Sequence, residues 1–137
     1  GSQSTGDRKD LEAGVLVGRA VELSHRSGKP LFLQILTDGS CSARSNSRNW
    51  SADSGNRTLT LMGYYNPEGV NQEKVQLGHF TSGEVAESTT FVGRRTDNVA
   101  KVVLLNYLSA IGKEADISKI VPDFDVAMID EHISFHI

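Results

Sequence analysis

Arginine, serine and asparagine side chains are concentrated between residues 38 and 57. This stretch holds six serines, three asparagines and three arginines. The guanidinium groups of Arg44, Arg48 and Arg57 are planar donor forks that suit phosphate or carboxylate, and serine and asparagine add neutral donors. Trp50 supplies a ring that can stack on a base or a sugar. The composition therefore predicts a recognition loop for an anionic or polar ligand, although it is equally typical of a solvated connection.

The length of this polar stretch also bears on its role. Long segments without regular structure are uncommon inside compact domains and are usually either functional or disordered. Arg94 and Arg95 follow the last of the strands expected in the middle of the chain. They extend the predicted ligand site if the order of the strands brings them to the same rim as the loop.

His132 and His136 lie near the end of the chain, with Asp130 just before them. Four residues of a strand span roughly 13 Å, whereas the ligands of one zinc ion lie about 2 Å from it. We therefore expect no shared metal, and no cofactor is indicated. Asp130 and His132 would share one face of a strand, where a carboxylate can orient a general base. All three residues are candidate catalytic groups, and the simpler interpretation is that they line a polar strand face.

Residues 28–33 read Gly-Lys-Pro-Leu-Phe-Leu, follow a predicted helix and are themselves followed by Cys41. This order resembles the opening of a thioredoxin-like domain. The Cys-x-x-Cys pair of that family is incomplete here, because Arg44 stands where the second cysteine would be. Dithiol–disulfide exchange within one chain needs both thiols, so we transfer no functional residues from the resemblance.

The run Leu31–Leu36 contains a single polar residue and is bounded by turn residues on both sides. Such a run predicts a central strand that is covered on both faces, with Leu33 and Ile35 in the core. A helix over residues 11–27 is expected to pack across this strand. Its predicted buried stripe consists of Ala13, Leu16, Val17, Ala20, Leu23 and Ser24.

The rest of the chain alternates between two periodicities. A period of two predicts an antiparallel meander, and a period near 3.6 predicts a second main helix. The last segment shifts its apolar residues by one position, which indicates a β-bulge near residues 130–131. The expected elements are strands at 58–65, 74–80 and 85–92, a turn at 66–69, a helix at 96–111, a helical turn at 115–120 and a strand at 125–137.

These elements predict an α+β fold. We expect a single domain over residues 7–137, built on a mainly antiparallel sheet of about five strands with two main helices packed on one face. Residues 1–6 are interpreted as a vector-derived remnant or a disordered terminus.

Composition limits the classes of partner. The 137 residues carry a net charge of −3, which does not favour nucleic acid. No apolar run approaches the roughly 20 residues that span a bilayer, so we expect a soluble protein without a membrane partner. The single cysteine and the lack of a visible signal peptide predict a cytoplasmic location. The oligomeric state is left open.

Three functions are compatible with these residues. The first is a small binding module that uses loop 38–57 to recognise an anionic or polar small ligand or a protein partner. The second is a small hydrolase or nuclease-like enzyme that uses a histidine of the C-terminal strand. The third is a self-assembling or immunity-type interaction domain whose contact surface is the sheet.

The loop hypothesis yields a direct test. Replacing Arg44, Arg48 and Arg57 together by alanine should abolish binding of an anionic ligand and leave the thermal melting temperature almost unchanged, because surface charges contribute little to stability. Lysine replacements should recover only part of the affinity, since lysine lacks the planar fork. A triple-alanine variant that unfolds would show that the arginines support the fold instead.

Overall fold

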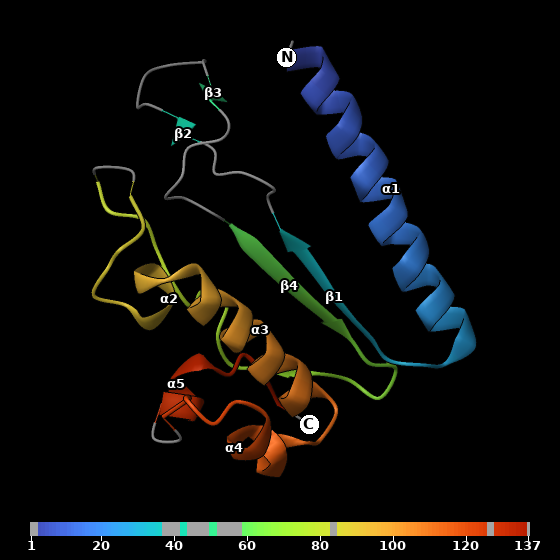
Figure 1. The fold of residues 1–137 in the computed structure, drawn as a ribbon. Coiled ribbons are helices and arrows are strands. Elements are labelled where there is room, and N and C mark those ends of the chain that lie inside the picture. Colours follow the sequence, from blue (N-terminus) through green and yellow to red (C-terminus); the bar gives the residue numbers. More distant parts are fainter. Residues whose placement is uncertain are drawn as a thin grey trace.

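The computed structural model describes residues 3–36, 42–43, 50–51, 59–82, 85–125 and 128–136. These ranges combine helices with short antiparallel strand pairs (Figure 1). In chain order the elements are α1 (Gln3–Ser27), β1 (Leu31–Leu36), β2 (Ser42–Ala43), β3 (Trp50–Ser51), β4 (Thr60–Tyr65), β5 (Asn71–Gln72), α2 (Phe91–Arg94), α3 (Thr96–Ala110), η1 (Glu114–Asp116), α4 (Ile117–Ile120), α5 (Ile129–His132) and β6 (Phe135–His136).

The strands form separate antiparallel pairs, so the predicted sheet of about five strands is wrong. β1 pairs with β4 from Leu31 opposite Tyr65 to Leu36 opposite Thr60, β2 pairs with β3, and β5 pairs with β6. In place of the expected meander over 74–80 and 85–92, the structure has one isolated bridge, between Phe80 and Ala86, and α2. Glutamine side chains bind main-chain carbonyls in the first of these segments, which offers its backbone an alternative to a sheet.

Two neighbouring tyrosines show how the helices lie against β1 and β4. The Tyr64 hydroxyl donates to the carbonyl of Ala110 in α3 at 2.7 Å, whereas the Tyr65 hydroxyl lies 2.8 Å from His25 Nδ1 in α1. Successive side chains of a strand point to opposite faces. The two long helices therefore do not share one face of this strand pair as predicted: α3 lies against one face, and α1 reaches the other face only with its C-terminal end and otherwise runs beside β1 (Figure 1).

The strand over Leu31–Leu36 is present, but its burial differs from the prediction. Leu31 and Leu33 are half-buried, whereas Ile35 is 41% exposed and Leu36 61% exposed. The strand has only β4 as a neighbour among the described residues, so too little structure surrounds its far end to cover both faces.

α1 also covers less of the strand than its apolar stripe predicts. The helix begins at Gln3 rather than near Leu11, and Leu11, Leu16 and Leu23 are 68%, 65% and 69% exposed. Among residues 5–27 of the helix, Ser24 is buried, and its hydroxyl donates to the carbonyl of Lys29 in the turn before β1. Within the described part of the chain, neither α1 nor another helix has the length and apolar content needed to cross a bilayer.

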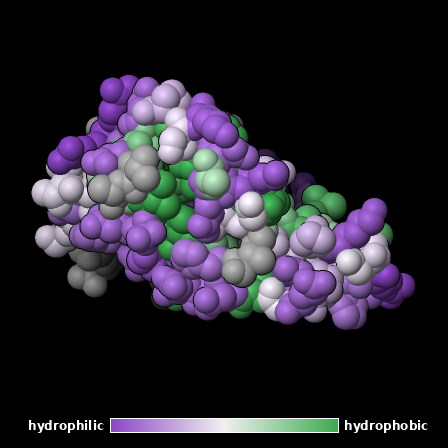
Figure 2. All heavy atoms as spheres, turned by 90° about the horizontal axis from the view of Figure 1, so that it is seen from below, coloured by the Kyte–Doolittle hydropathy of each residue, from purple (hydrophilic) through white to green (hydrophobic). Residues whose placement is uncertain are grey.

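The core is built around α3, which confirms the helix predicted over 96–111. Leu105 at its centre is fully buried. Figure 2 shows hydrophobic residues gathered in the middle of one face of the molecule, with hydrophilic residues around them. The buried apolar cluster consists of Val102, Leu105, Leu108, Ile117, Val121, Phe124 and Ile133.

The C-terminal segment is a helical turn followed by a strand, and not a strand with a bulge. α5 places Ile129 and Ile133 one turn apart, and the Ile133 N–H donates to the Ile129 carbonyl at 3.1 Å. The shift in apolar parity therefore marks a change from helical to strand periodicity. The predicted helical turn at 115–120 is confirmed by η1 and α4.

Asn106 ties this C-terminal segment to α3. Its side chain is completely buried, and its amide nitrogen donates to the carbonyls of Val102 and His132 at 2.9 and 2.8 Å. Its amide oxygen accepts from the Ser134 N–H at 2.7 Å. One side chain thus satisfies main-chain groups on both sides of Ile133 that would otherwise be buried without partners.

We expect Asn106→Ala to lower the free energy of unfolding by about 1–3 kcal/mol or more, because it leaves the buried Ser134 N–H and the buried His132 carbonyl without a partner. Asn71→Ala, at an exposed position on β5, is the matched control and should change it by less than about 0.5 kcal/mol. Urea denaturation of both variants checks this, and equal losses would contradict the role assigned to Asn106.

Candidate functional site

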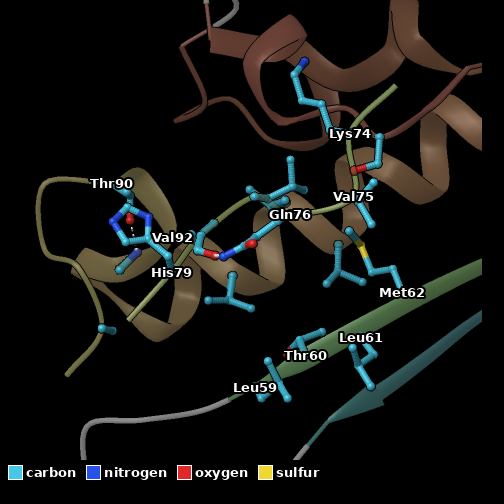
Figure 3. Close-up of a pocket in the computed structure, with 18 of the residues that line it drawn as sticks. Leu59, Thr60, Leu61, Met62, Lys74, Val75, Gln76, His79, Thr90 and Val92 are labelled. Carbon is cyan, nitrogen blue, oxygen red and sulfur yellow. Dashed lines mark hydrogen bonds between the residues drawn. The ribbon is translucent and has the colours of Figure 1, made fainter. Parts of the chain in front are cut away.

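A pocket of about 460 Å³ lies between β4, α3 and the chain that leads from β5 to α2 (Figure 3). Its size is within the range of ligand sites in proteins, roughly 300–1,000 Å³. The pocket is lined by residues 59–62, 72, 74–80, 86, 90, 92, 93, 99, 102, 103, 134 and 135.

α3 forms an apolar wall of this pocket. Val99, Val102 and Val103 follow the three- and four-residue spacing that places side chains on one face of a helix. Val102 is only 3% exposed and belongs to the core cluster, so this wall is continuous with the packed interior. A wall supported in this way keeps its shape when the pocket is filled or empty.

The pocket runs along the edge of β4 rather than over one of its faces. Residues 59–62 are consecutive and all line it. Because side chains of a strand alternate between faces, a pocket over one face would be lined by alternate residues only. Figure 3 shows the Thr60 and Met62 side chains on the pocket side of β4 and the Leu61 side chain on the other side, so the pocket borders the strand where its two faces meet.

The opposite wall is the segment over residues 74–80, which Figure 3 shows across the pocket from β4. The Lys74 ammonium donates to the Asp130 carbonyl and so attaches the start of the segment to α5. Further along, the Gln76 side-chain amide donates to the Gly78 carbonyl at 2.8 Å. These side-chain contacts hold the start and the middle of the segment, whereas its end is held by the bridge between Phe80 and Ala86, where the Glu87 N–H donates to the His79 carbonyl at 3.0 Å.

The end of the pocket near α2 is closely packed. The Thr90 hydroxyl donates to the Glu87 carbonyl at 2.7 Å and accepts from the Gly93 N–H at 3.1 Å. A Cβ atom at Gly93 would overlap the Glu87 carbonyl oxygen, so the close approach of these two backbone segments requires glycine at position 93. The Thr89 N–H donates to the Glu87 carboxylate at 3.0 Å and lowers the pKa of that group. This rim therefore keeps a negative charge over the physiological pH range.

His132 and Asp130 do not adopt the strand arrangement on which their proposed pairing depends. His132 is buried, its Nδ1 lies 2.9 Å from the Met128 carbonyl, and its ring packs edge-to-face against Phe91 and Phe124 at 5.2 and 6.0 Å. Asp130 is exposed on α5. These contacts give the imidazole a place in the core.

His136 lies between two glutamates. Its Nε2 is 3.5 Å from a carboxylate oxygen of Glu73, and its Nδ1 is 3.6 Å from one of Glu114, which also accepts from the Ser109 hydroxyl. Phe135 lines the pocket, so His136, as the next residue of β6, points away from it.

The arginines of the predicted ligand site fall into two groups. Arg94 and Arg95 are exposed beside the pocket: Arg94 Nε donates to the Ser88 carbonyl at 3.3 Å, and Arg95 Nε donates to the Asp97 carboxylate at 2.8 Å, which lowers the pKa of Asp97. Arg44, Arg48, Arg57 and the Trp50 side chain lie outside the described residues. The predicted convergence of the two groups stays a prediction.

The pocket itself was not predicted from the sequence. The sequence predicted the helix over 96–111 that carries its valines and the strands at 58–65 and 74–80 that border it, but not the space between them. Within the described ranges, no three histidine, cysteine, aspartate or glutamate side chains gather closely enough to hold a metal ion. We found no significant match to this chain among protein-family models, curated proteins or solved structures, and the site is interpreted from its geometry alone.

Proposed function

We propose that this protein is a binding module whose pocket between β4 and α3 receives an apolar part of its ligand. The observation that carries the proposal is the apolar lining: the valines of α3 border the pocket together with Met62 of β4 and with Val75 and Leu77 of the opposite wall. Binding sites for small molecules and peptides share this character, with mostly apolar walls and a few polar groups that orient the ligand. Thr60 and Gln76 supply such groups here.

A binding role is favoured over hydrolysis by a C-terminal histidine, because of the surroundings of His132 and His136. A general base needs a ring nitrogen within hydrogen-bond reach of the proton that it removes. His132 is packed among aromatic rings, and both ring nitrogens of His136 face glutamates. Neither histidine presents a free nitrogen to the pocket, so the hydrolase is the weaker of the two hypotheses.

We propose that the arginines of loop 38–57 make a second contribution to ligand binding, which can be tested separately from that of the pocket. Residues 37–58 connect Leu36 to Leu59, and Leu59 lines the pocket. A ligand that combines an apolar part with an anionic or polar group would use both, the pocket for the first and the arginines for the second. The triple-arginine variant described above tests that contribution on its own.

Filling the pocket should block it. Val99→Phe adds volume to the α3 wall, so it should weaken the binding of the neutral apolar fluorophore N-phenyl-1-naphthylamine at least about tenfold, equivalent to about 1.4 kcal/mol. Ala100→Phe is the matched control, because Ala100 is exposed on the same helix and does not line the pocket. Fluorescence titration measures both affinities, and circular dichroism confirms that both variants are folded.

The proposal is wrong if the parent protein does not bind the fluorophore saturably, or if folded Val99→Phe binds it as tightly as Ala100→Phe does. Should Val99→Phe not fold, Val103→Phe fills the same wall from a neighbouring position and replaces it in the comparison.

A further inference from the structure

We propose that the natural occupant of the pocket is an extended segment of a partner protein that pairs through its backbone with the outer edge of β4. This inference rests on the proposed function, since it names the ligand of the same pocket. It explains why the pocket follows the edge of a strand and why that edge has no partner among the described residues.

The first observation is the unpaired edge. β4 pairs with β1 along one side, and no backbone hydrogen bond joins it to any described residue outside β1. On its other side, alternate residues therefore direct their N–H and carbonyl groups toward the pocket. Such an edge is a ready template for an added strand.

The second observation is the combination of this edge with apolar walls. An apolar small molecule in the pocket leaves the main-chain N–H and carbonyl groups that it covers unpaired, at about 1–3 kcal/mol for each group, so it should bind more weakly than a ligand that pairs them. An extended peptide pairs those groups and still places alternate side chains against the α3 valines. In known cases of recognition by strand addition, the backbone hydrogen bonds supply the affinity, and pockets for alternate side chains supply the specificity.

The third observation concerns the opposite wall. Of the residues that the structure describes, none accepts a hydrogen bond from a backbone N–H of residues 74–80. The carbonyls of Lys74 and Gly78 accept instead from the side-chain amides of Gln72 and Gln76, at 3.4 and 2.8 Å. These glutamine amides occupy positions that the N–H groups of a bound strand can take over, and a strand in the pocket would then be paired on both sides.

The chemistry of the walls defines the peptide. Side chains directed toward α3 meet Val99 and Val103, so they should be apolar, and alternation along a strand places them at every second position. The residues between them point to the opposite face and are free to be polar. The expected ligand is thus a short extended sequence in which apolar and polar residues alternate.

Selection from a phage-displayed library of random eight-residue peptides tests this inference, with Val99→Phe as the counter-selection target and Ala100→Phe as the matched control. The parent protein and Ala100→Phe should enrich peptides with alternating apolar residues. The best peptide is then synthesised with N-methyl groups on one or the other set of alternate residues. At least one of these two forms should bind at least about tenfold more weakly than the unmethylated peptide, because N-methylation removes the N–H that pairs with the strand edge.

The inference is overturned if no peptide is enriched over Val99→Phe, or if both N-methylated forms bind as tightly as the unmethylated peptide. It is also overturned if sedimentation shows a dimer that the peptide does not dissociate, since a second copy would then occupy the edge. If the fluorophore still binds the parent protein in those cases, the proposed function stands and only the peptide is excluded. If the fluorophore also fails to bind, both proposals fall.

Discussion

The buried amide of Asn106 is the interaction on which the arrangement of the site depends. It holds the main chain on both sides of Ile133 and so places β6 against α3. β6 in turn pairs with β5, and the Glu73 N–H donates to the Ser134 carbonyl at 3.0 Å. Residues 74–80 follow directly from this pair. A polar side chain in the core thereby determines where the wall opposite β4 begins, and an apolar residue of the same volume could not do so.

Among the residues that the structure describes, the pocket lies between two backbone edges, those of β4 and of residues 74–80, that do not pair with each other. In a complete meander, β4 and residues 74–80 would be adjacent strands, and no space would be left between them. Here the second segment is attached elsewhere, through Lys74 to α5 and through the isolated bridge at Phe80. The valines of α3 close the space from one face. Binding is then the completion of a sheet that the described chain leaves incomplete.

Local sequence patterns predicted which helices and strands form, but they did not predict how these elements are buried or what they contact. The helix around α3, the turn of helix at α4, the strand at β1 and the turn at 66–69 follow from periodicity and turn residues, and all are present. The burial of Ile35 could not be predicted, because it depends on how many strands flank β1. The helical turn of α5 was mistaken for part of a strand, since its few residues are too short a window to show a period. The pocket depends on contacts between distant segments that no local pattern contains, and the candidate arginines 44, 48 and 57 lie outside the described residues.

Amide hydrogen exchange with the selected peptide bound tests the central claim most directly, because it reports on individual backbone N–H groups. The account predicts that alternate amides of β4 exchange more slowly in the complex, together with amides of residues 75–78, while the amides of β4 already paired with β1 change little. Slower exchange confined to α3, with β4 and residues 75–78 unchanged, would contradict pairing along the edge of β4.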